Sequence, residues 1–365
     1  MLTQADLELR RTARKSLSRH RHIEPADALG EMARSEYARL DTDFYGDGGA
    51  VARLEQRVSE LLGKPAGLYF FKGVMAQLCV MRRHAEDRQT TWVAFHPLSH
   101  IDYDEDNAVE HLHLLRPLRL GRTVPFTVKE LDQARERLAC VIVELPLRRA
   151  GYLLPSWDEL VAISGWCRQH GVPFHIDGAR LWESAAGYGR SLEEIAALGD
   201  SVYVSFYKGL GGLAGCVVAG EQRFLDSLKP WKTRHGGNLF SGYPYAVSAL
   251  MGLERYLPRM AEYVARARSL APKVATIPVF QVYPQPPHVN AFAIAMPGWP
   301  DRLAEQHRTF ARDTGVWLFN TFTEGPQPGT SIAEIVIGDT CEDFTDDEAA
   351  GWLRRFADRC QSAPV

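Results

Sequence analysis

Two reactive side chains stand directly after apolar segments that have the composition of buried β-strands. Asp177 follows the segment VPFHI, and Lys208 follows SVYVSFY and precedes a glycine-rich turn. The spacing between them leaves room for one helix and one strand. Because a right-handed crossover of that kind returns the chain to the same edge of a parallel sheet, we expect the two side chains to meet there.

A carboxylate and a lysine that meet at a sheet edge suit pyridoxal phosphate. The lysine amine forms a Schiff base with the aldehyde of this cofactor. A buried carboxylate keeps the ring nitrogen protonated, so that the ring accepts electrons from a substrate carbanion. The competing interpretation is a structural ion pair between Asp177 and Lys208, or an exposed lysine. The two local contexts together favour the cofactor.

The segment Phe71-Lys72-Gly73-Val74 is predicted to join a strand to a helix, where backbone N–H groups bind phosphate well. Lys72 would add positive charge, although turns of this kind are common and the signal is weak by itself. His100, in the segment HPLSHIDYDE, also follows a predicted strand and could lie flat on the pyridine ring. A surface or packing role is the alternative for this histidine.

The elements that must position these residues alternate along the first two thirds of the chain. Apolar periodicity predicts helices at 50–62, 74–84, 156–170 and 191–198, and strands at 67–71, 91–95, 138–145, 172–176, 201–207 and 216–219. This alternation predicts an α/β fold with a mostly parallel sheet flanked by helices.

After about residue 225 the pattern changes to a long helical region at 243–270, followed by three strands and two helices. The strands are predicted at 280–283, 291–295 and 332–337, and the helices at 300–314 and 346–360. We therefore expect an N-terminal arm at 1–45, a large cofactor-binding domain at 46–240 and a small α+β C-terminal domain at 241–365.

The composition is that of an ordinary soluble globular protein, with 365 residues, a net charge of -3 and 45% hydrophobic residues. It excludes a collagen, a disulfide mini-protein and a disordered chain. The balance of 42 Lys and Arg against 45 Asp and Glu argues against a nucleic-acid partner. No run reaches the roughly 18 apolar residues of a membrane helix, so we expect no membrane partner either.

The six cysteines show neither a CxxC pair nor a metal-ligand spacing, which is typical of reduced cysteines in a cytosolic protein. The histidines form no metal cluster by their spacing, so we expect no metal and a cytoplasmic location. Residues 10–22 are basic. A solvated basic helix or arm competes there with a mitochondrial transit peptide, against which Asp6 and Glu8 count.

These motifs together resemble the threonine aldolase group of the β-eliminating lyase family, which are pyridoxal phosphate enzymes of fold type I. The resemblance extends over roughly residues 24–347. It is strongest in YGDGGAVARLEQRVSELLGKPAGLYF and in HGVPFHIDGARLWESAAGYGRSLEEIAALGDSVYVSFYKGLGG, and weaker in RHGGNLF. HIDGAR and SFYKGLGG at this spacing form a specific signal, whereas YGDGGAVARLE is moderately specific.

The resemblance implies a role for each residue of the catalytic group. Lys208 would be the Schiff-base lysine, and Asp177 would pair with the pyridinium nitrogen. His100 would stack on the ring and help to move protons. Arg180 would hold the substrate carboxylate or the cofactor side of the site.

The resemblance also implies a phosphate site and an assembly. Gly73 and Val74 would begin the phosphate-binding helix, with Lys72 beside them. Lys232 or Arg234 would lie near a phosphate across a subunit boundary. The family forms dimers of dimers, so a homodimer or homotetramer with shared active sites is implied.

The sequence departs from the family at positions that face the phosphate and the substrate. Residues 72–74 read Lys-Gly-Val where the family usually carries Ser-Gly-Thr, so two hydroxyl donors are lost. Near the C-terminus, Glu334 stands in the stretch where the family has an arginine that binds the substrate carboxylate. Two like charges at about 4 Å repel by about 4 kcal/mol at an effective dielectric of 20. Arg148 and Arg149 could bind the carboxylate instead, or form a solvated turn.

Three functions follow from the retained cofactor residues and the altered substrate positions. The first is a threonine aldolase-like lyase that cleaves the Cα–Cβ bond of a β-hydroxy or β-substituted α-amino acid through an external aldimine, with release of glycine and an aldehyde. The second is β-elimination or β-replacement, in which Lys208 takes the Cα proton. The third is a non-catalytic scaffold of the same fold. In the first two, Arg180 and Glu334 would face the amino-acid substrate.

Overall fold

The computed structural model describes residues 3–17 and 19–362, and these form two compact units. One unit comprises Pro25–Pro258, and the other combines the described residues up to Glu24 with those from Arg259 onward. These divisions differ from the domain boundaries expected at 45 and 240. The helix that follows residue 242 packs against helices of the larger unit, and the N-terminal segment pairs with a C-terminal strand.

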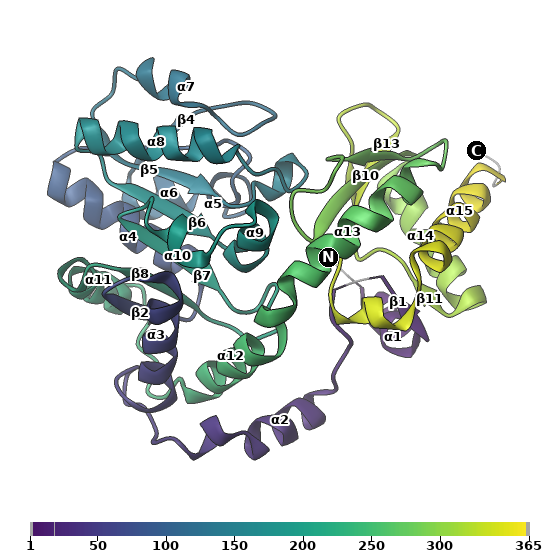
Figure 1. Cartoon of the computed structure of the whole chain (residues 1–365), viewed down its shortest axis with the longest axis horizontal. Coiled ribbons are helices and arrows are strands. Elements are labelled where there is room, and N and C mark those ends of the chain that lie inside the picture. The colour runs from purple at the N-terminus through teal and green to yellow at the C-terminus, as the bar shows by residue number, and fades with distance from the viewer. Residues whose placement is uncertain (1–2, 18, 363–365) are drawn as a thin grey trace. The chain divides into compact units, whose positions relative to one another are not determined.

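The larger unit is built on a seven-stranded sheet (Figure 1). Along the sheet the strand order is β2-β8-β7-β6-β5-β3-β4, with every pair parallel except the two that involve β8. The bounds are β2 (Ala66–Phe70), β3 (Trp92–Phe95), β4 (Arg116–Arg119), β5 (Leu138–Glu144), β6 (Phe174–Gly178), β7 (Ser201–Ser205) and β8 (Cys216–Gly220). The predicted mostly parallel sheet is confirmed, but the antiparallel direction of β8 and the existence of β4 were not predicted.

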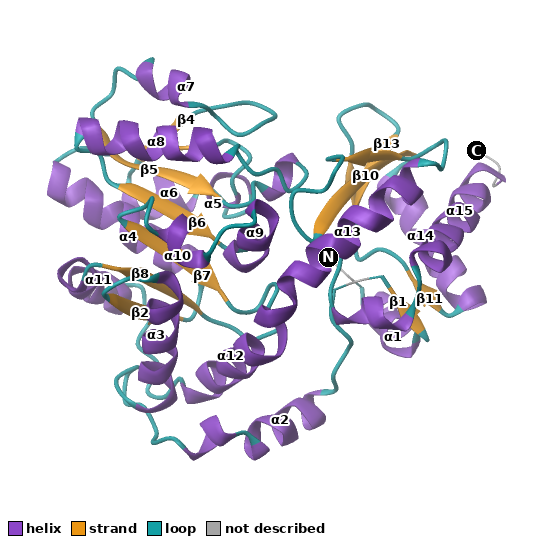
Figure 2. Cartoon of the chain, viewed as in Figure 1, coloured by secondary structure: helices purple, strands orange, loops and turns teal. Residues whose placement is uncertain are grey.

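Helices lie on both faces of this sheet (Figure 2). Their bounds are α2 (Pro25–Arg34), α3 (Gly49–Leu62), α4 (Gly73–Arg88), α5 (His100–Tyr103), α6 (Ala108–His113), α7 (Val128–Asp132), α8 (Trp157–His170), α9 (Leu181–Tyr188), α10 (Leu192–Ala196), α11 (Gln222–Arg234) and α12 (Tyr243–Tyr256). Ser156 and Ser191 cap α8 and α10 by accepting backbone N–H bonds, and α3 ends at Gly63 in the left-handed region.

The core explains why the central strands carry so few polar residues. Every residue of β5, β6, β7 and β8 is buried, as expected for strands covered on both faces. An apolar cluster joins α4 and α11 to β2, β7 and β8, and it includes Phe70, Tyr203 and Leu228. Since these strands are held from both sides, the residues at their ends have fixed positions.

The second unit contains a four-stranded antiparallel sheet of order β12-β13-β10-β9. Its elements are α1 (Gln4–Thr12), β1 (Lys15–Ser16), α13 (Met260–Ala275), β9 (Gln281–Tyr283), β10 (Ala291–Pro297), α14 (Pro300–Thr314), β11 (Val316–Trp317), β12 (Phe322–Glu324), β13 (Thr330–Val336) and α15 (Asp346–Ser362). The N-terminal strand β1 pairs in parallel with β11. Among the described residues, no helix is both long and apolar enough to cross a membrane.

The long helical region predicted at 243–270 is two helices rather than one. Between α12 and α13 the residues Leu257–Arg259 form a short 3-10 turn. Pro258 lies in this turn, and a proline has no backbone N–H to continue the α-helical hydrogen bonds. The division between the two compact units also falls at this proline.

Candidate active site

The carboxyl ends of four parallel strands bring three predicted reactive residues, together with Glu144, to one edge of the seven-stranded sheet. His100 follows β3, Glu144 ends β5, Asp177 lies in β6, and Lys208 comes three residues after β7. Strand β8 is antiparallel to both β7 and β2, so β2 runs in the same direction as β7. The N-terminus of α4, which follows β2, is therefore at this edge too.

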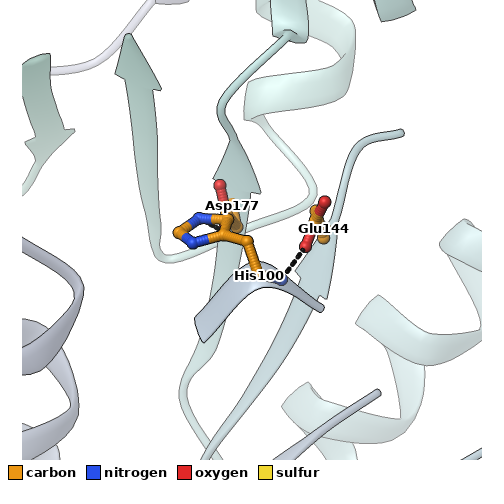
Figure 3. Close-up of side chains that lie close together, drawn as sticks. All are labelled: His100, Glu144 and Asp177. Atoms are coloured by element: carbon orange, nitrogen blue, oxygen red, sulfur yellow. Dashed lines mark hydrogen bonds and ion pairs between the residues drawn. The ribbon is translucent and has the colours of Figure 1, made fainter. Parts of the chain in front are cut away.

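His100 and Asp177 lie in contact at the centre of this edge (Figure 3). The His100 Nε2 atom is 2.9 Å from the Asp177 Oδ2 atom, and the Asp177 side chain is almost completely buried. The other Asp177 oxygen, Oδ1, accepts a hydrogen bond of 3.1 Å from the backbone N–H of Ala179. On its other side, His100 Nδ1 is 3.4 Å from Glu105 Oε1.

The charges in this group shift the protonation equilibria in opposite directions. Burial by itself would lower the pKa of His100, but the Asp177 carboxylate outweighs it and raises the pKa to about 10. Burial would raise the pKa of Asp177, but the charges of His100 and Lys208 hold it below its usual range. Burial raises the pKa of Glu144. In the protein without cofactor, the edge therefore holds an imidazolium and an ionised aspartate.

Lys208 and Arg180 lie in the segments that follow β7 and β6. Lys208 is half-buried, its ammonium is 5.6 Å from the centre of the Tyr207 ring, and its charge acts on both Asp177 and Glu144. Arg180 is buried at the start of α9, with its guanidinium 5.4 Å from the centre of the Tyr152 ring. Because the Lys208 charge helps to lower the pKa of Asp177, the electrostatics agree with the prediction that these two residues lie near each other.

The N-terminus of α4 packs closely against β7. A Cβ atom added to Gly73 would lie 2.2 Å from the Tyr203 hydroxyl oxygen, so only glycine fits there. That hydroxyl is buried and makes no hydrogen bond with the described residues. Lys72 precedes the helix and is exposed, whereas the Val74 side chain packs against an apolar cluster, so that only its backbone N–H is available.

The remaining predicted basic residues contact aromatic rings or a carboxylate of this chain. Lys232 is 5% exposed, with its ammonium 5.7 Å from the centre of the Phe70 ring, and burial lowers its pKa. The Arg234 guanidinium lies 4.4 Å from the centre of the Trp231 ring. The Arg149 guanidinium pairs with the Asp104 carboxylate, so it does not serve as the anchor for the substrate carboxylate.

Glu334 lies on β13 of the second unit, opposite Ala293 of β10. Its half-buried side chain alternates with the buried Ala333 and Ile335, so it is on the face of the strand opposite to theirs. The structure thus places this residue within a regular sheet rather than in a loop.

Sequence reasoning missed Glu144, Glu105 and Tyr203. Glu144 is the last residue but one of the predicted strand 138–145 and the last of the observed strand β5. A carboxylate at the end of a strand was the signal used for Asp177, so the same reasoning applied to Glu144. Glu105 follows His100 by five residues, and Tyr203 lies inside a predicted strand; neither has a distinctive sequence signal.

The three residues His100, Glu144 and Asp177 have potential metal ligand atoms within 4.8 Å of one another. Both Glu144 oxygens accept backbone N–H bonds, however, and Asp177 Oδ1 accepts another. The site fits a phosphorylated pyridine aldehyde better. Asp177 Oδ2 can accept a ring N–H, His100 is an aromatic neighbour, Lys208 is an amine, and the buried Tyr203 hydroxyl is available at the helix terminus.

Comparison with known proteins relates residues 25–296 to the family model of beta-eliminating lyases. The low-specificity L-threonine aldolase 1 of Arabidopsis thaliana is 25% identical over 314 residues, which cover 80% of this chain and 84% of that protein.

Two solved structures are more similar. A candidate L-allo-threonine aldolase from Listeria monocytogenes EGD-E is 32% identical with a TM-score of 0.90, covering 97% of this chain and 98% of that one. A candidate aromatic amino acid beta-eliminating lyase/threonine aldolase from Exiguobacterium sp. 255-15 is 31% identical with a TM-score of 0.89, covering 96% and 99%.

Proposed function

Since this chain belongs to the beta-eliminating lyase family, we propose that it is a pyridoxal phosphate-dependent carbon–carbon lyase with threonine aldolase-like activity. Its fold is that of the fold type I enzymes that use this cofactor. The observation that carries the proposal is the meeting of Asp177, His100 and the Lys208 segment at the edge where α4 begins.

The cofactor, when bound, withdraws electrons from the substrate Cα after the Cα–Cβ bond breaks. Lys208 would hold the cofactor through its amine. Asp177, which is buried and ionised, keeps a proton on the ring nitrogen. His100 would stack against the ring. Once the ring nitrogen takes its place at Asp177, the imidazole loses the contact that keeps it protonated and, as a neutral base, would accept the proton of the substrate β-hydroxyl, directly or through a water.

The phosphate is proposed to bind at the N-terminus of α4. The backbone N–H groups of Gly73 and Val74 would donate to it, and Lys72 would add the charge that replaces the missing hydroxyl donors. Of the two basic residues expected to contribute from a neighbouring subunit, Arg234 is the one proposed, because the Lys232 ammonium is enclosed against Phe70 of its own chain.

For the substrate carboxylate, Arg180 is the proposed anchor. It is buried and sits directly beyond β6, two residues after Gly178. Glu334 is proposed to face the substrate as a specificity residue, and its charge would disfavour an ordinary α-carboxylate close to it. An E334R variant that gains affinity for L-threonine would support this assignment, whereas an unchanged KM would contradict it.

The test of the lyase activity uses the purified protein loaded with the cofactor. We expect glycine and an aldehyde from at least one of L-threonine, L-allo-threonine and L-phenylserine. The K208A variant is the control, because it lacks the amine that holds the cofactor. The absence of aldehyde from all three substrates would contradict the proposal.

The second candidate is β-elimination, in which Lys208 removes the Cα proton and a leaving group departs from Cβ. Glu334 favours it, since a carboxylate stands where an aldolase of this family has a substrate-binding arginine. Pyruvate and ammonia from a β-substituted alanine such as β-chloroalanine, with no aldehyde from L-threonine, would establish this reaction in place of the first.

A homo-oligomer is proposed from an exposed aromatic cluster on the larger unit. Phe44, Tyr45 and Phe240 are 59%, 58% and 61% exposed, and the rings of Phe44 and Tyr45 both contact Phe240 edge-on. Exposed aromatic patches of this kind mark interfaces between proteins. We expect light scattering to show a dimer or tetramer. F240D should weaken this association, whereas the control V161D, at an exposed position on α8, should leave it unchanged.

A cytoplasmic location is also proposed. Its support is that all six cysteines are free thiols, five of them buried, as is usual in a reducing compartment. Cell fractionation with a tagged full-length chain tests this, and recovery in an organelle fraction would contradict it.

A further inference from the structure

Two buried carboxylates stand side by side at the carboxyl ends of neighbouring parallel strands. Glu144 of β5 and Asp177 of β6 are direct register partners, and their side chains are 6% and 1% exposed. Like charges directly opposite each other on neighbouring strands are unfavourable, and burial increases the cost. Asp177 is compensated by the imidazolium of His100. The burial of Glu144 beside Asp177 must therefore be offset by other interactions of the Glu144 carboxylate.

Glu144 uses both of its oxygens to bind the backbone of two different loops. Its Oε2 atom accepts a hydrogen bond of 2.8 Å from the backbone N–H of His100, as Figure 3 shows. Its Oε1 atom accepts one of 3.3 Å from the backbone N–H of Arg148. One side chain thus joins the loop after β3 to the loop after β5.

We propose that Glu144 is a positioning residue that holds His100 in place for proton transfer, by binding the main chain from which the imidazole projects. The backbone of His100 starts α5, a helix of only four residues, which has little rigidity of its own. The carboxylate anchors this short helix to the fully buried strand β5. This inference rests on the proposed function, in which His100 accepts the substrate proton.

Glu144 also contributes to the charge that surrounds the imidazole. The groups that face His100 are Asp177 from β6, Glu105 from the segment after α5, and Glu144 from β5, and the Lys208 charge acts on the two strand carboxylates. The negative charge of Glu144 is among the causes that raise the pKa of His100. Two variants separate this charge from the backbone bonds.

The variant E144Q removes the charge and leaves one acceptor oxygen for two N–H groups. The variant E144D keeps the charge but is one methylene shorter, so it cannot reach both N–H groups. The matched control is D200N, because Asp200 also binds a backbone N–H of this sheet, that of Phe174 at 2.7 Å, at the opposite ends of the strands.

We expect kcat to fall about 10²-fold in both Glu144 variants, as for a misplacement of about 1 Å, with little change in KM. In E144Q the acid limb of the kcat profile should also move to lower pH by roughly one unit, because the lost negative charge no longer stabilises the imidazolium. In E144D the limb should stay in place. D200N should lower the free energy of unfolding and leave kcat and the pH profile unchanged.

A second measurement does not depend on the substrate. In ¹⁵N-histidine-labelled protein without cofactor, the His100 ring, assigned with H100Q, should titrate at lower pH in E144Q than in wild type. A wild-type kcat and pH profile in both Glu144 variants, or an unshifted His100 titration in E144Q, would overturn the proposal. If wild type cleaves no amino acid, the proposed function fails, while the titration still decides whether Glu144 acts on His100.

Discussion

The close approach of Gly73 to Tyr203 predicts that Gly73→Ala is severe. The new Cβ would lie 2.2 Å from the Tyr203 hydroxyl oxygen and 3.0 Å from the ring carbon that bears it, whereas ordinary contact begins at 3.4 Å. Something must move by about 1.2 Å, and Tyr203 is completely buried. Overpacking of a core typically costs about 1–3 kcal/mol. Since α4 begins at Gly73, a displaced helix terminus should also weaken cofactor binding by about tenfold or more.

The second half of this experiment is the double variant G73A/Y203F. Removal of the hydroxyl leaves 3.0 Å as the nearest contact, so the double variant should recover part of the loss, with a coupling energy of about 0.5–3 kcal/mol. By itself Y203F should lower the free energy of unfolding by less than G73A, because the buried hydroxyl has Tyr207 and Cys216 as polar neighbours but no well-aligned hydrogen bond among the described residues.

The matched control is G165A in α8, an exposed helical position with no atom within 4 Å of the added Cβ. This change should stabilise the protein by about 0.5–1 kcal/mol. The assays are urea denaturation and cofactor titration by absorbance. The reasoning is refuted if G73A behaves like G165A, or if the effects of G73A and Y203F simply add.

Three further predictions concern the catalytic edge. Borohydride reduction of the loaded protein should attach the cofactor to Lys208, and K208A should lose this label; a label on another lysine would contradict the assignment. D177N should lower kcat by at least about 10²-fold while it retains some bound cofactor, because an amide does not hold a proton on the ring nitrogen; unchanged kcat would exclude this role. In the protein without cofactor, the pKa of His100 is raised to about 10, above the roughly 6.5 of an unfolded chain. The contact with Asp177 should therefore stabilise the fold fully below about pH 6.5, and this stabilisation should disappear as the pH rises through about 10. The free energy of unfolding of H100Q relative to wild type, measured at both ends of that range, checks the sign; a larger loss at high pH would contradict it.

Much of the fold could be predicted because apolar periodicity reports burial. Strands 138–145, 172–176 and 201–207 were identified within one or two residues of their observed ends, since fully buried strands have almost no polar residues. The short strand β4 has half-buried and exposed residues only, so it lacked that signal. The direction of β8 depends on which strands it pairs with, which a local pattern cannot specify.

The grouping of the N-terminal segment also depends on distant partners. Residues 1–45 were expected to form an arm, yet β1 pairs with β11 and α1 packs on α14, so the described residues up to Glu24 group with the C-terminal unit. Hydrogen bonds of this kind join residues about 300 positions apart. No local preference of residues 4–16 for helix or strand indicates where that partner lies.

The sequence by itself determined which residue types follow the central strands, and therefore that an acid, a lysine and a histidine would gather at one edge of a parallel sheet. A parallel crossover makes this inference general, since it needs only the ends of strands. The tertiary structure alone decided the neighbours of each residue at that edge. The pairing of Glu144 with Asp177, the contact of Tyr203 with Gly73 and the enclosure of Lys232 all depend on strand register and packing between segments far apart in the chain. Burial and distance set the charges and contacts of such groups, and both exist only once the chain has folded.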